Sequence, residues 1–231
     1  MSCSTPVKHY PKEQDIPKRM HCIIKEIQHK TIADIGTDHG YIPIYACLFG
    51  YAHNAIACDI RPEPLIAAKK NITAHNLADR IQIRLGNGLA PIYPKEVESV
   101  IITGMGGDSI INILSDGGKV VQSLEQLVLS PQSNVPKVRR FLHGIDWKIT
   151  NEEFIYTEKK HYTIIVATQG SEPPYTTGEY ELGKILIQKK EPDFLAYADQ
   201  QIGIYEKIRA KVKGRRLEEI EKLLEIYKEL L

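Results

Sequence analysis

The sequence has few cysteines, no apolar run long enough to cross a bilayer and almost no net charge. Its four cysteines, at positions 3, 22, 47 and 58, form neither a C-x-x-C pair nor a metal-ligand spacing, which favours a reduced cytoplasmic protein without a metal site. The N-terminal segment lacks the apolar core of a secretory signal, so we expect no export and no membrane partner. A net charge of +1 excludes a uniformly basic nucleic-acid binder, although a local basic patch fits within a balanced total.

The chain of 231 residues is long enough to bury one main core, and its pattern alternates short apolar strands with helical segments. Strands are expected at 31–36, 54–59, 81–88, 99–107 (with a glycine-rich exit), 125–130, 147–156 and 161–168. Helices are expected at 18–27, 42–48, 62–76, 108–114 and 134–144. The short polar link "TEKK" joins the last two strands and predicts an antiparallel hairpin. The predicted fold is therefore α/β, with a mostly parallel, doubly wound (Rossmann-like) sheet and an antiparallel edge hairpin.

The composition changes after Thr168, where "QGSEPPYTTGE" is typical of a linker and almost everything beyond it is helical. Apolar residues then recur at coiled-coil spacing in two stripes, with Gly214 between them. The first stripe is Phe194, Ala198, Ile202, Tyr205, Ile208 and Val212, and the second is Leu217, Ile220, Leu224, Tyr227 and Leu231. We expect an α/β domain at 1–170 and an antiparallel coiled-coil hairpin domain at 171–231.

The turn after the first strand, "ADIGTDHG", differs from a dinucleotide-binding loop. A G-x-G-x-x-G loop lets the backbone touch a pyrophosphate, whereas the carboxylate of Asp38 in this turn would repel one. A ligand with a cationic amine and a sulfonium suits the turn, and class I methyltransferases have D-x-G-x-G-x-G at this place. Asp34, Gly36 and Gly40 match that motif, with Asp38 instead of the middle glycine. We therefore expect S-adenosylmethionine as the cofactor.

Three further strand ends fit the same cofactor, because open α/β sheets bind ligands at the carboxyl ends of their strands. Asp59 ends the second strand, where it can accept hydrogen bonds from both ribose hydroxyls. Asn87, in the "GNG" after the third strand, can donate to and accept from an adenine edge. Gly104 ends the fourth strand and leaves room for the methionine portion. The predicted cofactor-binding residues are Asp34, Gly36, Thr37, Asp38, Gly40, Asp59, Ile60, Asn87, Gly88 and Gly104.

Several segments together resemble one family. "DIGTDHGYIP", "GNGL", "GMGG", "SPQSN" and the helical C-terminal hairpin are similar to the bacterial tRNA (adenine-22-N1)-methyltransferases, the TrmK family, over nearly the whole chain. The resemblance implies a class I methyltransferase fold, S-adenosylmethionine as cofactor and tRNA as substrate, methylated at N1 of an adenine at the base of the D-arm. It also implies that "ADIGTDHG" binds the donor, Asp59 the ribose and Asn87 the adenine side, and that "GMGG" lies below the target base. Many class I enzymes have an aspartate where Asn87 stands.

N1 of adenine carries a free lone pair near neutral pH, so alignment should dominate the rate. Because the product is cationic, Asp38 is a candidate catalytic residue that either stabilises the developing charge or takes a proton from the exocyclic amine. Capping of the following helix is an alternative role for Asp38 and is compatible with the first. N1 lies on the Watson–Crick edge, so the base must leave its pairing, and His39, Tyr41 or Met105 can then cover its face.

Most of these residues also have a structural interpretation. His39, the second catalytic candidate, also fits a hydrogen-bonded structural histidine, and Tyr41 fits ordinary packing. "GMGG" fits a tight strand exit as well as a substrate loop. "SPQSN" resembles the N-P-P-Y motif of amino-group methyltransferases but follows the fifth strand instead of the fourth, so we assign it a turn and helix-cap role and leave a substrate contact open.

Basic residues are the expected contacts to a polyanionic substrate. The segment "KIRAKVKGRR", 207–216, holds six basic residues and no acid at the turn of the predicted hairpin, where charge can reach phosphates; a solvated helix tip is the alternative. Lys18 and Arg19 fit either a solvated helix start or a phosphate contact. The predicted substrate-binding residues are Lys18, Arg19, Tyr41, Met105, Gly106, Lys211, Lys213, Arg215 and Arg216.

Three classes of function are compatible with the sequence. A tRNA methyltransferase is the leading hypothesis. A nicotinamide-dependent small-molecule oxidoreductase is disfavoured by Asp38 and by the lack of a separate substrate domain. A non-catalytic adaptor that binds a partner through the helical hairpin is the third, although no feature of the sequence points to an obligate protein partner.

Overall fold

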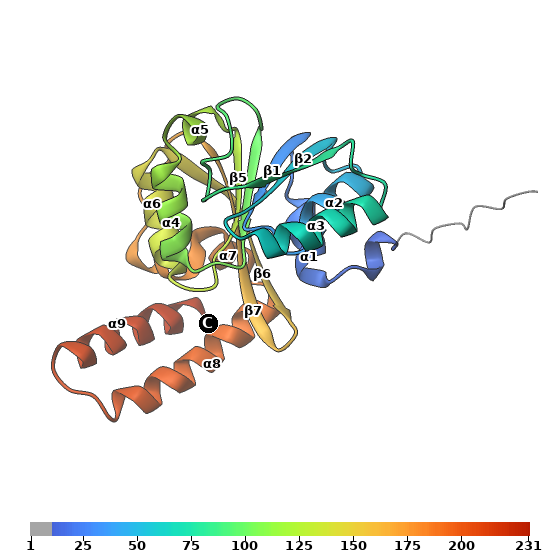
Figure 1. Cartoon of the computed structure of the whole chain (residues 1–231). Helices are drawn as coiled ribbons and strands as arrows, with labels where there is room; N and C mark the ends of the chain where they lie inside the picture. The colour runs from blue at the N-terminus through green and yellow to red at the C-terminus, as the bar shows by residue number, and fades with distance from the viewer. Residues whose placement is uncertain (1–10) are drawn as a thin grey trace, which may run out of the picture. The chain divides into compact units, whose positions relative to one another are not determined.

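The computed structural model describes residues 11–231, so Cys3 lies outside the described residues (Figure 1). The described chain forms two compact units. The first unit runs up to Ile101 and includes Gly117–Leu124, and the second comprises Ile102–Asp116 and Glu125–Leu231. The expected domain boundary near residue 170 stays a prediction. Within residues 11–231, no helix combines the length and the apolar character needed to cross a membrane.

The strands form one seven-stranded sheet in the order β3-β2-β1-β4-β5-β7-β6. Their bounds are β1 (Thr31–Ile35), β2 (Asn54–Asp59), β3 (Ile81–Leu85), β4 (Ser99–Thr103), β5 (Gln126–Ser130), β6 (Trp147–Thr157) and β7 (Lys160–Gln169). The expected α/β sheet with an antiparallel edge hairpin is therefore confirmed. β3 and β4 end before the positions expected for them, because glycine-containing turns follow Leu85 and Thr103.

In the first unit, β1 pairs in parallel with β2, and β2 pairs in parallel with β3. β1 and β2 are buried along nearly their whole length, as expected for parallel strands whose faces are covered by helices. The helices of this unit are η1 (Glu13–Asp15), α1 (Lys18–Lys25), α2 (Tyr41–Leu48), α3 (Pro62–Ala74) and α5 (Gly118–Ser123). α5 was not predicted, because six residues are too few to display a helical period.

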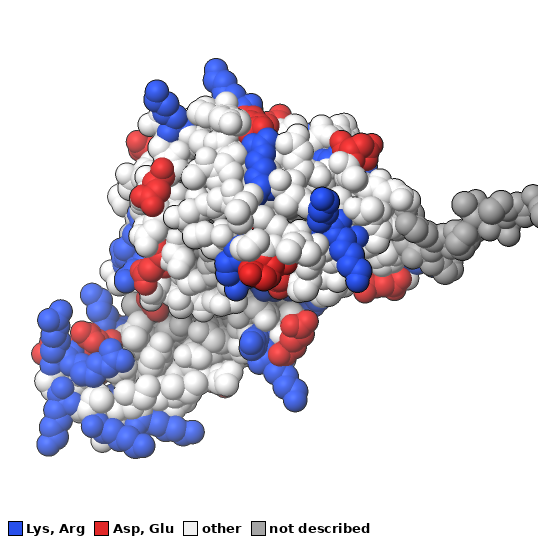
Figure 2. Space-filling view, viewed as in Figure 1, with Lys and Arg blue, Asp and Glu red and all other residues white. Residues whose placement is uncertain are grey.

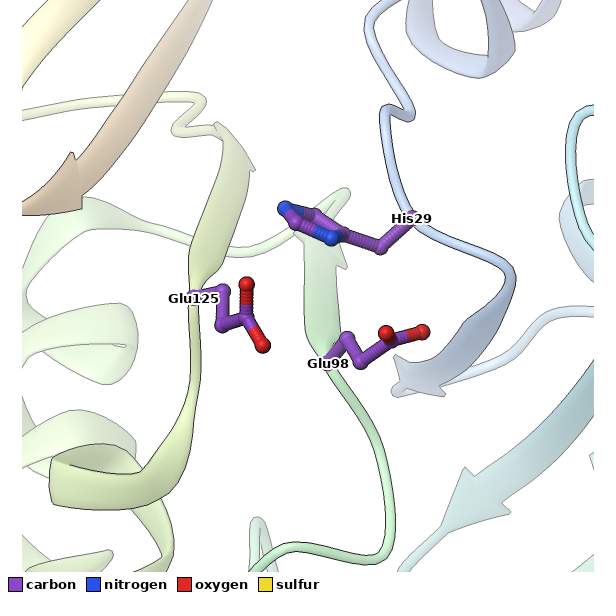
Figure 3. A group of neighbouring side chains, drawn as sticks. All are labelled: His29, Glu98 and Glu125. Atoms are coloured by element: carbon purple, nitrogen blue, oxygen red, sulfur yellow. The ribbon is translucent and has the colours of Figure 1, made fainter.

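Glu98, which directly precedes β4, holds the start of β1. Its Oε2 accepts hydrogen bonds from the backbone N of Thr31 (3.0 Å) and from Thr31 Oγ1 (2.8 Å). The bond from the Thr31 side chain is the main cause that lowers the pKa of Glu98, and the neighbouring His29 contributes to the same shift (Figure 3). The Glu98 carboxylate therefore stabilises the first residue of β1.

In the second unit, β7 pairs antiparallel with both β5 and β6. The turn between β6 and β7 consists of Glu158 and Lys159, with φ of 52° and 60°. Positive φ at both positions is the geometry of a two-residue type I′ hairpin turn, whose twist matches that of the strands. The helices of the sheet region in this unit are α4 (Gly107–Asp116) and α6 (Val135–Gly144).

The C-terminal helices are η2 (Glu179–Gly183, a π-helical turn), α7 (Lys184–Lys189), α8 (Pro192–Arg209) and α9 (Arg215–Leu230). α8 and α9 form the expected hairpin, with Gly214 at its turn (φ 59°) (Figure 1). The base of the hairpin packs in an apolar cluster of Phe154, Leu182, Leu186, Phe194, Ala198, Tyr227 and Leu230. Leu231 was wrongly predicted in the stripe: it follows the last helical residue and is 57% exposed, whereas Leu230 is buried. The coiled-coil geometry itself stays a prediction.

The segment expected to be a linker makes specific contacts. Glu172 Oε1 accepts a hydrogen bond from the backbone N of Ile149 (2.7 Å) and lies 2.9 Å from His143 Nε2. Tyr175 is buried and packs edge-on against the ring of His143. Composition alone does not reveal such contacts, because Glu, Pro and Tyr are equally compatible with a solvated spacer.

Candidate functional site

The turn after β1 stays hydrogen-bonded to the end of β2. The backbone N–H groups of Gly36 and Thr37 both donate to the carbonyl oxygen of Cys58, each at 2.8 Å. Gly36 has a φ of 76°, in the left-handed region that glycine adopts without a steric penalty. The first glycine of the predicted motif is therefore required by the backbone of this turn.

Asp34 lies at the base of the turn and is almost completely buried. Burial raises the pKa of the Asp34 carboxyl from 3.8 to about 7, and the carboxylates of Asp59 and Asp38 add to the rise. The neighbouring Thr37 hydroxyl, which is also buried, acts against this rise. A buried acid with a raised pKa is costly for stability alone, and such costs are typical of functional sites.

Asp59 ends β2, as expected. Its Oδ1 accepts a hydrogen bond from the backbone N of Arg61 (2.8 Å) and lies 3.6 Å from Arg61 Nε. Ile60 and Leu85 are large apolar side chains beside this carboxylate, 61% and 60% exposed, and Leu85 is the register partner of Asp59. Exposed apolar surface next to an oriented carboxylate suits a ligand with a flat ring and hydroxyl groups. The sequence analysis did not place Arg61 or Leu85 at the site. The positive charge of Arg61, two residues after Asp59, was a signal that could have identified it.

The "GNG" turn follows β3. The backbone N of Gly86 donates to the carbonyl oxygen of Asp59 (3.0 Å), which places the turn next to the end of β2. Gly88 has a φ of 52°, and the side chain of Asn87 is exposed. The predicted residues Asp34, Gly36, Thr37, Asp59, Ile60, Asn87 and Gly88 thus all lie at the carboxyl ends of β1, β2 and β3, within the first unit.

Asp38 and His39 stand on the outer side of the turn. Asp38 Oδ1 lies 3.3 Å from His39 Nε2, and the two side chains are 85% and 53% exposed. The N-cap of α2 is Gly40, and no side chain makes a capping hydrogen bond there, so the alternative capping role of Asp38 is wrong. The carbonyl oxygen of His39 accepts a bond from Asn71 Nδ2 (2.9 Å), which fixes the backbone rather than the imidazole.

Gly40 has a packing role. A Cβ at this position would lie 3.1 Å from Cβ of Ala68 in α3, so glycine allows α2 and α3 to approach closely. Tyr41 follows it and stacks between His39 (centroids 6.0 Å apart) and Tyr45 (5.7 Å). Packing along α2 therefore explains part of the role of Tyr41, and its contact with a substrate stays a prediction.

The "GMGG" loop belongs to the second unit and interlocks with "SPQSN". The backbone N of Gln132 donates to the carbonyl oxygen of Met105 (2.8 Å), and the backbone N of Gly107 donates to that of Ser133 (2.9 Å). A Cβ on Gly107 would lie 2.5 Å from the Ser133 carbonyl oxygen, whereas a Cβ on Gly104, at φ 78°, would meet nothing within 4 Å. Gly107 is thus needed for packing, and Gly104 borders open space. Gly106 lies against Ser133 Oγ.

The helix-cap role expected for "SPQSN" is only partly correct. Asn134 is the N-cap residue of α6, with φ 54°, but its side chain makes no capping hydrogen bond. Instead, Asn134 Nδ2 donates to Asp108 Oδ2 and so ties α6 to the start of α4. Lys137 Nζ joins the same carboxylate at 3.2 Å.

The basic candidates divide into two groups. Lys18 is exposed in the first turn of α1, whereas Arg19 is partly buried; a phosphate contact of either residue stays a prediction. Figure 2 shows lysine and arginine side chains gathered over the far end of the α8–α9 hairpin. Lys211, Lys213, Arg215 and Arg216 are all exposed there. Arg216 Nη1 lies 2.9 Å from Glu219 Oε2, an exposed pair of little energetic value.

Comparisons with known proteins show which family this chain belongs to. Residues 16–165 match the model of the Methyltransferase domain family, so the chain belongs to that family. The chain is 29% identical over 233 residues to the tRNA (adenine(22)-N(1))-methyltransferase of Bacillus subtilis (strain 168), with 95% of this chain and 98% of the relative covered. The crystal structure of the B. subtilis tRNA methyltransferase TrmK has a TM-score of 0.83 at 29% identity and covers 93% of this chain and 98% of that chain.

A further similar structure contains the expected cofactor. Streptococcus pneumoniae Sp1610 in complex with S-adenosyl-L-methionine has a TM-score of 0.86 at 28% identity, with 94% of this chain and 99% of that chain covered. The similarity to TrmK enzymes inferred from the motifs is therefore confirmed along the chain.

Proposed function

We propose that this protein is an S-adenosylmethionine-dependent tRNA methyltransferase that methylates N1 of the adenine at position 22. The observation that carries the proposal is the similarity to a tRNA (adenine(22)-N(1))-methyltransferase over 95% of the chain. The arrangement of the turns after β1, β2 and β3 supports it, because polar groups and exposed apolar side chains meet at the carboxyl ends of parallel strands.

The first unit fits the cofactor residue by residue. Asp59 is nine-tenths buried and already oriented by Arg61, as needed to bind two ribose hydroxyls. Ile60 and Leu85 offer apolar surface to an adenine ring, and Asn87 offers an amide to its edge. When bound, S-adenosylmethionine supplies an electrophilic methyl group on a sulfonium. Asp38 gives the turn a negative charge, which favours a cationic ligand over a pyrophosphate.

Asp38 is also the proposed catalytic residue. Its exposed carboxylate is available to an incoming base, and the developing positive charge on the adenine strengthens that interaction in the transition state. The same oxygen can accept a proton from the exocyclic amine. His39, next to it, presents a ring to the base and can fix the carboxylate orientation. Tyr41, Met105 and Gly106 are proposed to contact the target nucleotide.

The substrate surface is proposed to include the basic end of the α8–α9 hairpin and Lys18. These side chains are exposed, and phosphate contacts position a nucleic acid without reading its sequence. A tRNA substrate agrees with the cytoplasmic location that the cysteine pattern predicts.

The test is methylation of an unmodified tRNA transcript with isotope-labelled donor, followed by mass spectrometry of the nucleosides. We expect labelled 1-methyladenosine from a transcript with adenine at position 22 and none from a matched transcript with guanine there. Calorimetry should detect binding of S-adenosylmethionine and no binding of NAD. Product from both transcripts would contradict the proposed position, and NAD binding without methyl transfer would favour the oxidoreductase.

A further inference from the structure

A cavity lies outside the turns that form the proposed donor site. It is a groove of about 400 Å³ between the end of the β6–β7 hairpin and the first half of α8, within the second unit. The hairpin contributes Tyr156, Lys159 and His161, and α8 contributes Asp193, Ala196, Tyr197, Gln200 and Gln201. Its volume falls within the range of small-ligand pockets. We refer to it as the hairpin groove.

Aromatic rings form one wall of the hairpin groove. The rings of Tyr156 and His161 lie 4.7 Å apart at 32°, and those of His161 and Tyr197 lie 4.9 Å apart. Tyr156 is 46% exposed, although it belongs to a strand whose neighbours Phe154 and Ile155 are buried. Burial lowers the pKa of His161, which favours the neutral imidazole. The exposed ring of Tyr156 beside this imidazole can accept the face of a further planar ring.

Polar groups that suit a nucleotide surround these rings. Lys159 is exposed at the type I′ turn and lines the groove, so one cation stands at this end of it. Gln200 and Gln201 provide amide donors and acceptors on α8, and Asp193 provides a carboxylate. Amides and a carboxylate match the amino and imino groups at a base edge, while Lys159 matches a phosphate. This mixture is too polar for the apolar core of a protein-binding surface.

We infer that the hairpin groove binds one unpaired nucleotide of the tRNA substrate, with the base against Tyr156 and His161 and its phosphate near Lys159. The inference rests on the proposed function, because it takes the RNA to be the natural ligand. Stacking platforms combined with cations are a common means of binding single-stranded nucleic acid without strict sequence preference.

The position of the hairpin groove on α8 agrees with a continuous RNA surface. Gln201 lines the groove, and Arg209 ends the same helix eight residues later, which corresponds to about 12 Å along the helix axis at 1.5 Å per residue. Lys207 and Arg209 begin the basic segment that was predicted to contact phosphates. A single RNA strand can therefore touch the groove and the basic end of the hairpin together.

The experiment compares four proteins: wild type, Tyr156→Leu, Tyr156→Phe and the control Tyr93→Leu. Leucine keeps an apolar side chain but removes the stacking ring, and phenylalanine restores the ring. Tyr93 is a matched control, since it is 72% exposed, lies outside the hairpin groove and belongs to the first unit. The measurements are the Kd for fluorescently labelled tRNA by anisotropy, the KM and kcat for methylation, and the Kd for S-adenosylmethionine.

We expect Tyr156→Leu to raise the tRNA Kd and KM about tenfold, the loss typical of one stacked base, with kcat and donor affinity unchanged. Tyr156→Phe should recover most of the affinity, and Tyr93→Leu should resemble wild type. Tyr156→Leu with the tRNA affinity of Tyr93→Leu would overturn the inference. So would a Tyr156→Leu variant with unchanged tRNA affinity but an altered oligomeric state in size-exclusion chromatography, which would make the hairpin groove an interface between copies of the chain.

The anisotropy measurement separates this inference from the proposed function. If wild type binds tRNA but forms no 1-methyladenosine, the proposed function fails, and the comparison of Tyr156→Leu with Tyr93→Leu still decides whether the groove binds RNA. If methylation occurs and the two leucine variants behave alike, only the groove inference fails.

Discussion

The ion pair between Arg139 and Glu152 is expected to be the most sensitive point of the second unit. Arg139 in α6 and Glu152 in β6 are 1% and 0% exposed, and Arg139 Nε donates to Glu152 Oε1 at 2.7 Å. Arg139 Nη1 also donates to the carbonyl oxygens of Tyr180 (2.9 Å) and Glu181 (3.0 Å) in η2. One guanidinium thus joins a helix, a strand and the π-helical turn that precedes α7.

Replacing Arg139 by methionine keeps most of the buried volume but leaves a buried carboxylate without its cationic partner and the carbonyl groups of Tyr180, Glu181 and Leu182 without this donor. Removing one partner of a buried ion pair costs about 3–5 kcal/mol, a large share of the roughly 5–15 kcal/mol that stabilises a domain. The double variant Arg139→Met with Glu152→Leu removes the stranded charge as well. This double variant should recover most of the lost free energy of unfolding. About 1–3 kcal/mol should remain lost, because the carbonyl groups stay unpaired.

Urea unfolding followed by tryptophan fluorescence measures these differences directly. Trp147 is the single tryptophan and is buried at the start of β6, so its emission reports on this part of the sheet. Arg140→Met is the control, because Arg140 is exposed and lies over the Tyr180 ring, 4.1 Å from its centroid, a contact worth about 0.5–1 kcal/mol. If Arg139→Met unfolded at the same urea concentration as Arg140→Met, the reasoning about the buried pair would be refuted.

Four further predictions concern the proposed site and substrate surface. Asp59→Ala should weaken S-adenosylmethionine binding by roughly 1.5–3 kcal/mol in calorimetry, because it removes a charged acceptor; unchanged affinity in a folded variant would contradict the ribose assignment. Asp38→Asn should lower kcat with tRNA more than donor affinity, and a loss confined to donor affinity would make Asp38 only a binding residue. The pKa of Asp34 is raised from 3.8 to about 7, so the folded state retains a proton that the unfolded state releases between these values. This carboxyl should therefore reduce the free energy of unfolding as the pH rises through that window, by up to about 1.4 kcal/mol per pH unit, and Asp34→Asn should flatten the dependence; equal slopes in urea titrations would exclude this. Replacing four basic residues of the hairpin by glutamine should raise the tRNA KM and leave donor affinity unchanged. The slope of log tRNA affinity against log salt concentration should become smaller in magnitude by about 1 per lost phosphate contact. Normal methylation across a salt titration would assign the hairpin another role. The four residues are Lys211, Lys213, Arg215 and Arg216.

Local sequence signals predicted most of the sheet and the proposed donor turn. β2 was predicted with its observed bounds, since a short run of buried apolar residues is bracketed by turn-forming residues. Asp34 and Gly36 were identified by their match to D-x-G-x-G-x-G, and Asp59 because it stands at the end of an apolar strand; the structure adds the positive φ that explains the glycine at position 36. These signals act within a few residues, so a single sequence contains them. α5 and the register of Leu230 were missed, since a six-residue helix and a helix end carry too little periodicity.

The buried ion pair of Arg139 and Glu152 and the hairpin groove depended on tertiary structure. Arg139 and Glu152 are 13 residues apart, and the carbonyl groups that complete the site of Arg139 come some 40 residues later; nothing in the intervening sequence marks them as partners. In the same way, the hairpin groove exists because the β6–β7 hairpin and α8 meet in space, which brings Tyr197 and Gln200 of α8 to the rings of Tyr156 and His161. The sequence determined which segments become strands and turns, because backbone sterics and side-chain periodicity are local. Tertiary structure decided which charges are buried together and which rings stay exposed, because burial depends on contacts between segments that the chain brings together only on folding.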